Sequence, residues 1–378
     1  AGAAQDGGEG LPPAGGQQAE ATGAEIGRAS FLKGSANQKG VRSMRRSSLL
    51  LLVVPVLLVL SAPCRHAGAA ETVLRFAGQF PEEHTSTRLM MQIADEVKER
   101  TGGRIEIQVF PDNELGDYTL VYEELIRGSL DLAAITVPSQ FDPRLELANV
   151  NGVVRTFDEA RAAFAPDGWI FRKMDEMHSA LGVKLLGFQF EGFIGIGSVK
   201  PVNEPLDPEA KKGILLRIPN MEVFKLGAEA MGYRTITIPW DEVRASLQNG
   251  FAEGVDGMTP AAAFTILGDV IKHWYDLRYS VENLNFMMSM KTWDRLSGED
   301  RAIIRDACAK VAAVSVYLAE EDQEKCLQEM ADAGIEVHRY TDSELRPLFV
   351  KLASTWDGLA ERFTPEFMEE FKREFAPK

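Results

Sequence analysis

The chain has 378 residues, of which 45% are hydrophobic, and its 41 basic and 56 acidic residues give a formal net charge of −15. This length and composition allow two globular domains with a sizeable core. The negative charge argues against nucleic acid and anionic membrane surfaces as binding partners. In such an acidic protein, a single basic residue in a candidate binding cleft is a candidate for binding an anionic ligand.

The first 70 residues have the composition of a leader and not of a folded domain. Residues 1–43 are rich in Gly, Ala and Gln, and we expect them to be disordered and to lie upstream of the translated protein. Residues 44–70 begin at the first methionine and are typical of a signal peptide, with an apolar run at residues 49–60. Because that run is too short to span a membrane, we expect cleavage near Ala69 or Ala70 and a periplasmic protein that does not insert into the membrane.

Hydrophobic periodicity in the following part of the chain alternates between strand and helix. Strands are expected at residues 72–77, 104–110 and 130–137. Amphipathic helices are expected between them, the first capped by Thr85 or Ser86 and ended by Gly102, the second ended by Gly128. This order predicts a parallel sheet with helical cover.

The second part of the chain alternates in the same way around a glycine-rich stretch. Helices are expected at residues 157–181, 261–268 and 297–333, strands at 183–188, 285–290 and 335–338, and two short helices at the C-terminus. Residues 192–198 hold three glycines, which weaken a strand unless another backbone or a ligand approaches closely. We therefore expect the chain to cross there between two domains and to form one wall of a cleft.

Residues 211–260 are the segment around which the sequence is organised. Their pattern predicts a strand, a helix, a second strand, a second helix and a third strand. One arginine, Arg217, stands at the end of the first of these strands. From its position alone, such an arginine is either a rim residue paired with a carboxylate or a ligand anchor.

The same segment carries a spaced set of residues: Lys212-Gly213-x-x-x-Arg217-x-Pro219, then Gly232-Tyr233, then Pro239-Trp240-x-Glu242-Val243-x-x-x-Leu247-Gln248-x-Gly250, and then Val255-Asp256-Gly257. This order resembles the signature region of the DctP-type solute-binding proteins of tripartite ATP-independent periplasmic (TRAP) transporters. The resemblance extends from about Leu74 to the C-terminus. It implies an α/β, two-lobe periplasmic binding protein fold with discontinuous domains, central sheets covered by helices, and a long helix spanning both lobes.

By analogy with that family, residues 71–192 and 281–320 are assigned to lobe one, and residues 193–280 and 321–378 to lobe two. The resemblance implies a periplasmic receptor that binds a small organic acid and delivers it to the membrane permease subunits of a TRAP transporter. Two other roles stay open: a receptor that presents its ligand to a sensor kinase, and an exported enzyme on the same scaffold.

The resemblance also implies a set of ligand-binding residues. In the family, an arginine at the position of Arg217 pairs with a ligand carboxylate, which the planar guanidinium fork matches with two parallel hydrogen bonds. Trp240 stands at a position that is usually aromatic and close to the ligand, and a core role for it is equally open. The further candidates are Phe80 and His84 in the loop before the first helix, Phe190 and Glu191 before the glycine-rich stretch, and Ile194, Met258 and Thr259.

Two departures from the family pattern bear on the ligand. Many dicarboxylate and sialic-acid binders of the family carry a second arginine where this chain has Ile194. The family often follows Val-Asp-Gly with Gln-Glu-Asn-Pro, where this chain has Met258-Thr259-Pro260-Ala261. Because a C4-dicarboxylate would leave its second charge without a partner, we expect a monocarboxylate with an apolar, aromatic or hydroxylated body.

The sequence contains no motif that indicates catalysis or a bound cofactor. Its five histidines show no metal-ligand spacing, and HExxH, CxxC, P-loop and GxSxG motifs are absent. We expect no cofactor, and the sequence leaves open whether a metal ion assists ligand binding. Cys308 and Cys326 lie in one expected helix, roughly 27 Å apart, which is too far for a disulfide. We therefore expect two free thiols.

Overall fold

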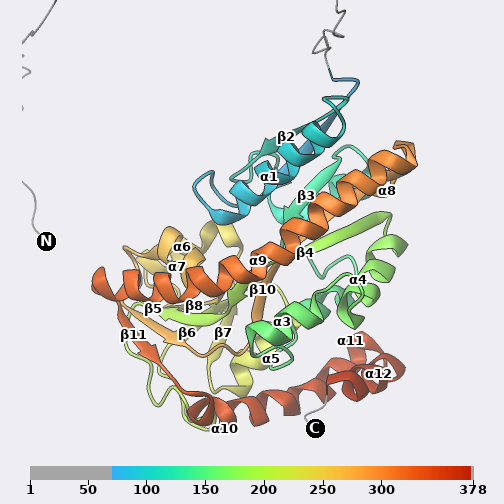
Figure 1. Ribbon diagram of the computed structural model, residues 1–378. Coiled ribbons are helices and arrows are strands. Elements are labelled where there is room, and N and C mark those ends of the chain that lie inside the picture. The colour runs from blue at the N-terminus through green and yellow to red at the C-terminus, as the bar shows by residue number, and fades with distance from the viewer. Residues whose placement is uncertain (1–69, 376–378) are drawn as a thin grey trace, which may run out of the picture. The chain divides into compact units, whose positions relative to one another are not determined.

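The computed structural model describes residues 70–375, and the expected leader before Ala70 lies outside this range. The described chain contains one five-stranded and one six-stranded sheet with helices packed around them (Figure 1). This arrangement confirms the α/β fold class. None of the helices in residues 70–375 is long and apolar enough to cross a membrane.

The first sheet has the strand order β2-β1-β3-β10-β4. Its strands are β1 (Thr72–Gly78), β2 (Ile105–Phe110), β3 (Leu132–Ile135), β4 (Val183–Phe193) and β10 (Val281–Ser289). As predicted, β1 runs parallel to β2 and β3. In contrast, β10 is antiparallel to both β3 and β4, because it returns from the second sheet and is not part of the first β-α-β-α-β unit.

The second sheet has the strand order β11-β9-β5-β8-β6-β7. Its strands are β5 (Gly195–Ser198), β6 (Leu215–Ile218), β7 (Arg234–Thr237), β8 (Gly254–Met258), β9 (His273–Asp276) and β11 (Glu336–Arg339). Between β4 and β5 the chain leaves one sheet and enters the other, at the glycine-rich stretch. It crosses back between β9 and β10, and again along the helix that leads to β11.

Helices cover both sheets. They are α1 (Thr85–Arg100), α2 (Tyr118–Arg127), α3 (Phe157–Ala163), α4 (Trp169–Ala180), α5 (Glu222–Ala230), α6 (Val243–Gln248), α7 (Pro260–Leu267), α8 (Met290–Arg295), α9 (Gly298–Asp332), α10 (Asp342–Ala353), α11 (Ala360–Phe363) and α12 (Pro365–Phe375). Short 3₁₀ turns occupy Pro143–Asn149 (η1), Trp240–Glu242 (η2) and Ser354–Leu359 (η3).

The helix α9 connects the two lobes. It packs against α1 and β4 of the first sheet and against α7 and β11 of the second, and Figure 1 shows it running past both. Ser297 caps its first turn by accepting a hydrogen bond from the Asp300 amide at 3.1 Å, as the sequence predicts. Cys308 and Cys326 both lie on this helix as free thiols.

Several local predictions were wrong in detail. The cap of α1 is His84, whose Nδ1 accepts from the Ser86 amide at 3.2 Å, and not Thr85 or Ser86. Strand β9 was not predicted, because its sequence His-Trp-Tyr-Asp does not alternate between apolar and polar residues. Residues 157–181 form two helices, separated at Gly168, and not one.

The C-terminal helices contact residues of both expected lobes. The Trp356 indole nitrogen donates to the Asn151 carbonyl at 2.9 Å, and η3 also packs against α5. The Trp169 indole nitrogen donates to Glu370 at 2.9 Å. The expected assignment of residues 321–378 to lobe two therefore stays a prediction.

Gly195, where the chain enters the second sheet, is packed too closely for a side chain. A Cβ atom there would lie 2.5 Å from the Trp274 ring and 2.6 Å from the Tyr275 carbonyl oxygen. We expect Gly195→Ala to lower the free energy of unfolding by about 1–3 kcal/mol, as overpacking does, measured by urea denaturation. Gly298→Ala is the matched control, since a Cβ at Gly298 meets no atom within 4 Å. Equal stability of the two variants would contradict this account.

Candidate functional site

Arg217 is a buried cation in β6, with 2% of its surface exposed. Burial lowers the pKa of its guanidinium to about 10, against the opposing effect of Tyr118, Asp256 and Glu282. Its Nε donates to the Ile238 carbonyl at 3.0 Å and its Nη1 to the Asp256 carbonyl at 3.2 Å. Within residues 70–375, no hydrogen bond engages Nη2.

The Val-Asp-Gly signature lies in strand β8, beside Arg217. The Asp256 carboxyl oxygen Oδ1 accepts hydrogen bonds from the Gly257 amide at 2.6 Å and from the Tyr279 hydroxyl. Gly257 has φ +79°, and a Cβ there would lie 3.1 Å from the Pro219 ring, so glycine is required on two counts. The buried carboxyl thereby fixes the backbone carbonyl that accepts from Arg217. Burial raises the pKa of Asp256 to about 7.

Arg217 lines a cavity of 40 Å³ between residues of the two sheets. Phe80, Trp240 and Met258 form part of its apolar wall. It adjoins a cavity of 490 Å³, with which it shares Tyr118 and Trp240. The larger cavity lies within the volume range of small-molecule sites. The two cavities together provide a charged end and room for an organic body.

Glu282 faces the same cavity as Arg217 from strand β10. Its Oε1 accepts from the Thr136 hydroxyl at 2.7 Å, and Thr136 is in turn held by Gln79 through bonds of 2.9 and 3.2 Å. Burial raises the pKa of Glu282 to about 7, although Thr136 and Arg217 oppose the shift. Its charge therefore changes near neutral pH.

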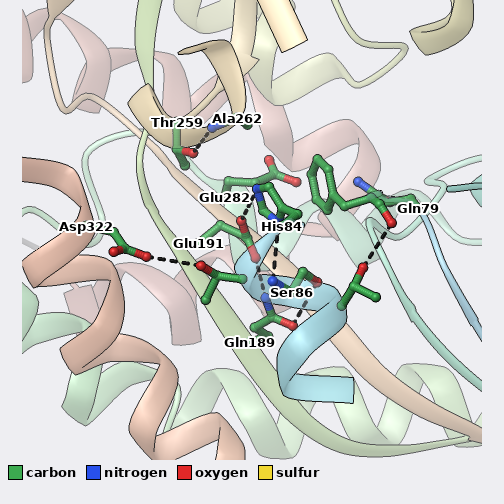
Figure 2. Close-up of polar contacts among 12 residues, drawn as sticks. Gln79, His84, Ser86, Gln189, Glu191, Thr259, Ala262, Glu282 and Asp322 are labelled. Atoms are coloured by element: carbon green, nitrogen blue, oxygen red, sulfur yellow. Dashed lines mark hydrogen bonds and ion pairs between the residues drawn. The ribbon is translucent and has the colours of Figure 1, made fainter. Parts of the chain in front are cut away.

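His84 and Glu191 line a separate cavity of 270 Å³, and Figure 2 shows them joined with Gln189 and Ser86 in one polar network. The His84 Nε2 and Glu191 Oε2 atoms lie 3.7 Å apart. Burial lowers the pKa of His84 to about 4 and raises that of Glu191 to about 8. Both groups are therefore neutral at pH 7, and their contact is not an ion pair.

Aromatic rings connect the Arg217 cavity of 40 Å³ with the His84 cavity of 270 Å³. Phe80 stacks on His84 with ring centroids 4.1 Å apart and meets Trp240 edge-on at 6.4 Å. Trp240 in turn lies 5.9 Å from the Arg217 guanidinium carbon, within cation–π range. The structure thus brings Arg217, Trp240, Phe80 and Met258 to one cavity, and His84 to the next.

Three of the ligand-binding candidates proposed from the sequence either lie outside the Arg217 cavity or have a structural role. Ile194 is fully buried, and its amide donates to the Ser280 carbonyl at 2.9 Å. Thr259 caps α7, accepting from the Ala262 amide at 3.3 Å (Figure 2). Phe190 lines the His84 cavity but also packs edge-on against Phe157. Ile194 and Thr259 line none of the cavities around Arg217 and His84.

The family model for bacterial extracellular solute-binding protein, family 7 (DctP) matches residues 76–362. The chain belongs to this family. A sialic acid-binding periplasmic protein, SiaP, from Vibrio cholerae is 26% identical over 75% of this chain and 89% of its own length. The C4-dicarboxylate-binding periplasmic protein DctP of Rhodobacter capsulatus is 24% identical over 82% of this chain and 92% of its own.

Solved structures of TRAP periplasmic solute-binding proteins share the fold. A TRAP periplasmic solute-binding protein from Haemophilus influenzae with bound L-gulonate superposes with a TM-score of 0.71 and 20% identity, covering 80% of this chain and 99% of its own. The two-lobe architecture expected from the sequence is thereby confirmed, as is the resemblance to DctP-type proteins.

Sequence reasoning missed four polar residues of the Arg217 cavity: Gln79, Tyr118, Thr136 and Glu282. For Glu282 a signal exists, because it is the one acidic residue of strand β10, in which every residue is buried. The others lie at strand ends or a helix start, where only the fold shows which way they face. In residues 70–375, no group of three His, Cys, Asp or Glu near Arg217 has ligand atoms close enough to share a metal ion.

The position of Thr259 predicts a capping role. We expect Thr259→Ala to lower the free energy of unfolding by about 1 kcal/mol, because the α7 amide loses its acceptor, and Thr259→Ser to retain it. Thermal unfolding measures this, and isothermal titration with any organic acid that the parent protein binds should give an affinity unchanged within about twofold. A large loss of affinity at unchanged stability would instead place Thr259 at the ligand.

Proposed function

We propose that this chain is the periplasmic receptor of a TRAP transporter and binds an organic acid whose carboxylate pairs with Arg217. The observation that carries the proposal is the buried guanidinium, held through Nε and Nη1 and without a hydrogen bond at Nη2 within residues 70–375, in a small cavity of 40 Å³ that adjoins one of 490 Å³. A carboxylate there would gain a charge-assisted hydrogen bond in a site sheltered from water. After cleavage of its leader, the receptor delivers the acid to the membrane permease subunits.

The ligand is a monocarboxylate with an apolar, aromatic or hydroxylated body. Among the residues lining the two cavities around Arg217, no second Lys or Arg occurs, so a second ligand carboxylate would lack a cationic partner. Trp240, Phe80 and Met258 suit an apolar or aromatic body. Gln79, Thr136 and Glu282 offer hydrogen bonds to hydroxyl groups.

The two lobes are the sheets with their helices, and closure about the β4–β5 and β9–β10 crossings would sequester the acid. The assignment of residues 71–192 with 281–320 to one lobe, and 193–280 with 321–378 to the other, belongs to this proposal. The strands of the first sheet fall in the first set and those of the second sheet in the second.

Isothermal titration with a panel of acids tests the ligand class. We expect L-gulonate, mandelate or a related hydroxy or aromatic monocarboxylate to bind more tightly than succinate or malate. Tightest binding by succinate or malate would contradict the monocarboxylate assignment. For the acid that binds most tightly, Arg217→Ala should weaken the binding free energy by about 2–5 kcal/mol, as truncation of one partner of a buried charge pair does.

Two further variants test whether the loss of affinity is specific to the guanidinium group of Arg217. Arg217→Lys keeps the charge but not the planar fork and should recover only part of the affinity. Arg244→Ala is the matched control, since Arg244 pairs with Asp269 at the surface. Folding of each variant is checked by its unfolding temperature without ligand. An Arg217→Ala protein that folds and binds within threefold of the parent would refute the anchor role.

Affinity should fall as pH rises through 7, because ionised Glu282 opposes a ligand carboxylate and partly neutralises Arg217. With a pKa of about 7 for Glu282, linkage gives a loss of about tenfold between pH 6 and pH 8. Glu282→Gln should weaken this pH dependence of affinity. Only the smaller contributions from the titration of Asp256 and Glu191 should then remain. The exposed Glu99→Gln is the charge-matched control. An unchanged pH profile in Glu282→Gln would contradict the proposed role.

A further inference from the structure

His273, Glu336 and His338 come together at the edge of the second sheet, away from the ligand cavity. Strands β9 and β11 pair in parallel there, with His273 opposite Glu336 and Tyr275 opposite His338. Because side chains alternate along a strand, Glu336 and His338 project from the same face of β11. The pairing of the strands adds His273 from β9 to that face.

One imidazole nitrogen from each histidine and the two Glu336 carboxylate oxygens lie at distances similar to those between the ligand atoms of a metal ion. His273 Nδ1 lies 3.3 Å from Glu336 Oε2, His338 Nε2 lies 3.5 Å from His273 Nδ1, and His338 Nε2 lies 3.7 Å from Glu336 Oε1. Ligand atoms at about 2.0–2.2 Å from a tetrahedral Zn²⁺ ion are separated by about 3.3–3.6 Å. An ion could therefore be bound with only small side-chain adjustments.

The chemistry of the group suits a transition metal. Two imidazole nitrogens and a carboxylate favour Zn²⁺ and its neighbours over Mg²⁺ or Ca²⁺, which prefer oxygen ligands alone.

The surroundings hold the ligands in place. The His338 ring stacks on Tyr275 with centroids 4.3 Å apart and an interplanar angle of 2°, and the Tyr275 hydroxyl accepts from the Val202 amide at 2.8 Å. The histidine side chains are 12% and 27% exposed, and that of Glu336 66%. The site is thus formed on rigid strands and accessible to an ion from solvent.

We propose that His273 Nδ1, His338 Nε2 and the Glu336 carboxylate bind one Zn²⁺ ion, with water as the fourth ligand. The ion would fasten the edge strand β11 to β9 and so stabilise the end of the second sheet, because it binds only the folded arrangement. Arg217 lies on β6, separated from β9 by β5 and β8. Zinc binding here is therefore independent of the organic-acid proposal.

The test uses the chain from residue 70 onward, which lies within one compact unit, prepared without a polyhistidine tag. Zn²⁺ is titrated at pH 7.5 in competition with a chromophoric chelator, and Co²⁺ is added separately as a spectroscopic probe. We expect about one equivalent of tight binding and the visible absorption bands of tetrahedral Co²⁺. Mg²⁺ and Ca²⁺ should not compete. No Zn²⁺ binding below millimolar concentration would overturn the proposal.

Variants locate the ion. His338→Gln and Glu336→Gln should each weaken Zn²⁺ binding at least about tenfold and abolish the rise in unfolding temperature that Zn²⁺ produces. Glu336 is exposed, so its variant should fold normally even if His338→Gln does not. Glu324→Gln is the matched control, because Glu324 pairs with Arg339 and not with the histidines. Zn²⁺ binding that survives both ligand changes would show that the ion sits elsewhere.

Discussion

The burial of one guanidinium group is the constraint on which the site depends. Arg217 is removed from water in the middle of a sheet, and an unpaired charge there would be costly. The carbonyl groups of Ile238 and Asp256 compensate part of that cost by accepting from Nε and Nη1. These acceptors come from the strands on either side of β6, so the order β8-β6-β7 is what makes the buried charge tolerable.

The same buried setting makes nearby acidic groups titrate near neutral pH. Burial raises the pKa values of Asp256 and Glu282 to about 7, and Arg217 opposes both shifts. The protein carries a formal net charge of −15, yet the surroundings of Arg217 combine a cation that stays charged with carboxyl groups that can be neutral. Local desolvation, and not the overall charge, therefore sets the field that an entering carboxylate meets.

Much of the fold could be predicted because its signals are local. The start of α9 at Ser297, the alternation of β1 and β2, and the apolar face of α1 each depend on a few neighbouring residues. Strand β9 escaped prediction, because its sequence His-Trp-Tyr-Asp does not alternate between apolar and polar residues. The cap at His84 escaped because histidine is an uncommon acceptor at a helix start, and its ring is fixed by stacking on Phe80.

The sequence by itself determined most of the elements, the family, and Arg217 as the candidate ligand anchor. Tertiary structure alone decided which side chains share a space. It placed Glu282 opposite Arg217, separated His84 and Glu191 into a second cavity, buried Ile194 and made Thr259 a helix cap. It also brought His273 beside Glu336 and His338. The physical reason is that strand pairing joins residues far apart in the chain, and no spacing along the sequence records which strands become neighbours.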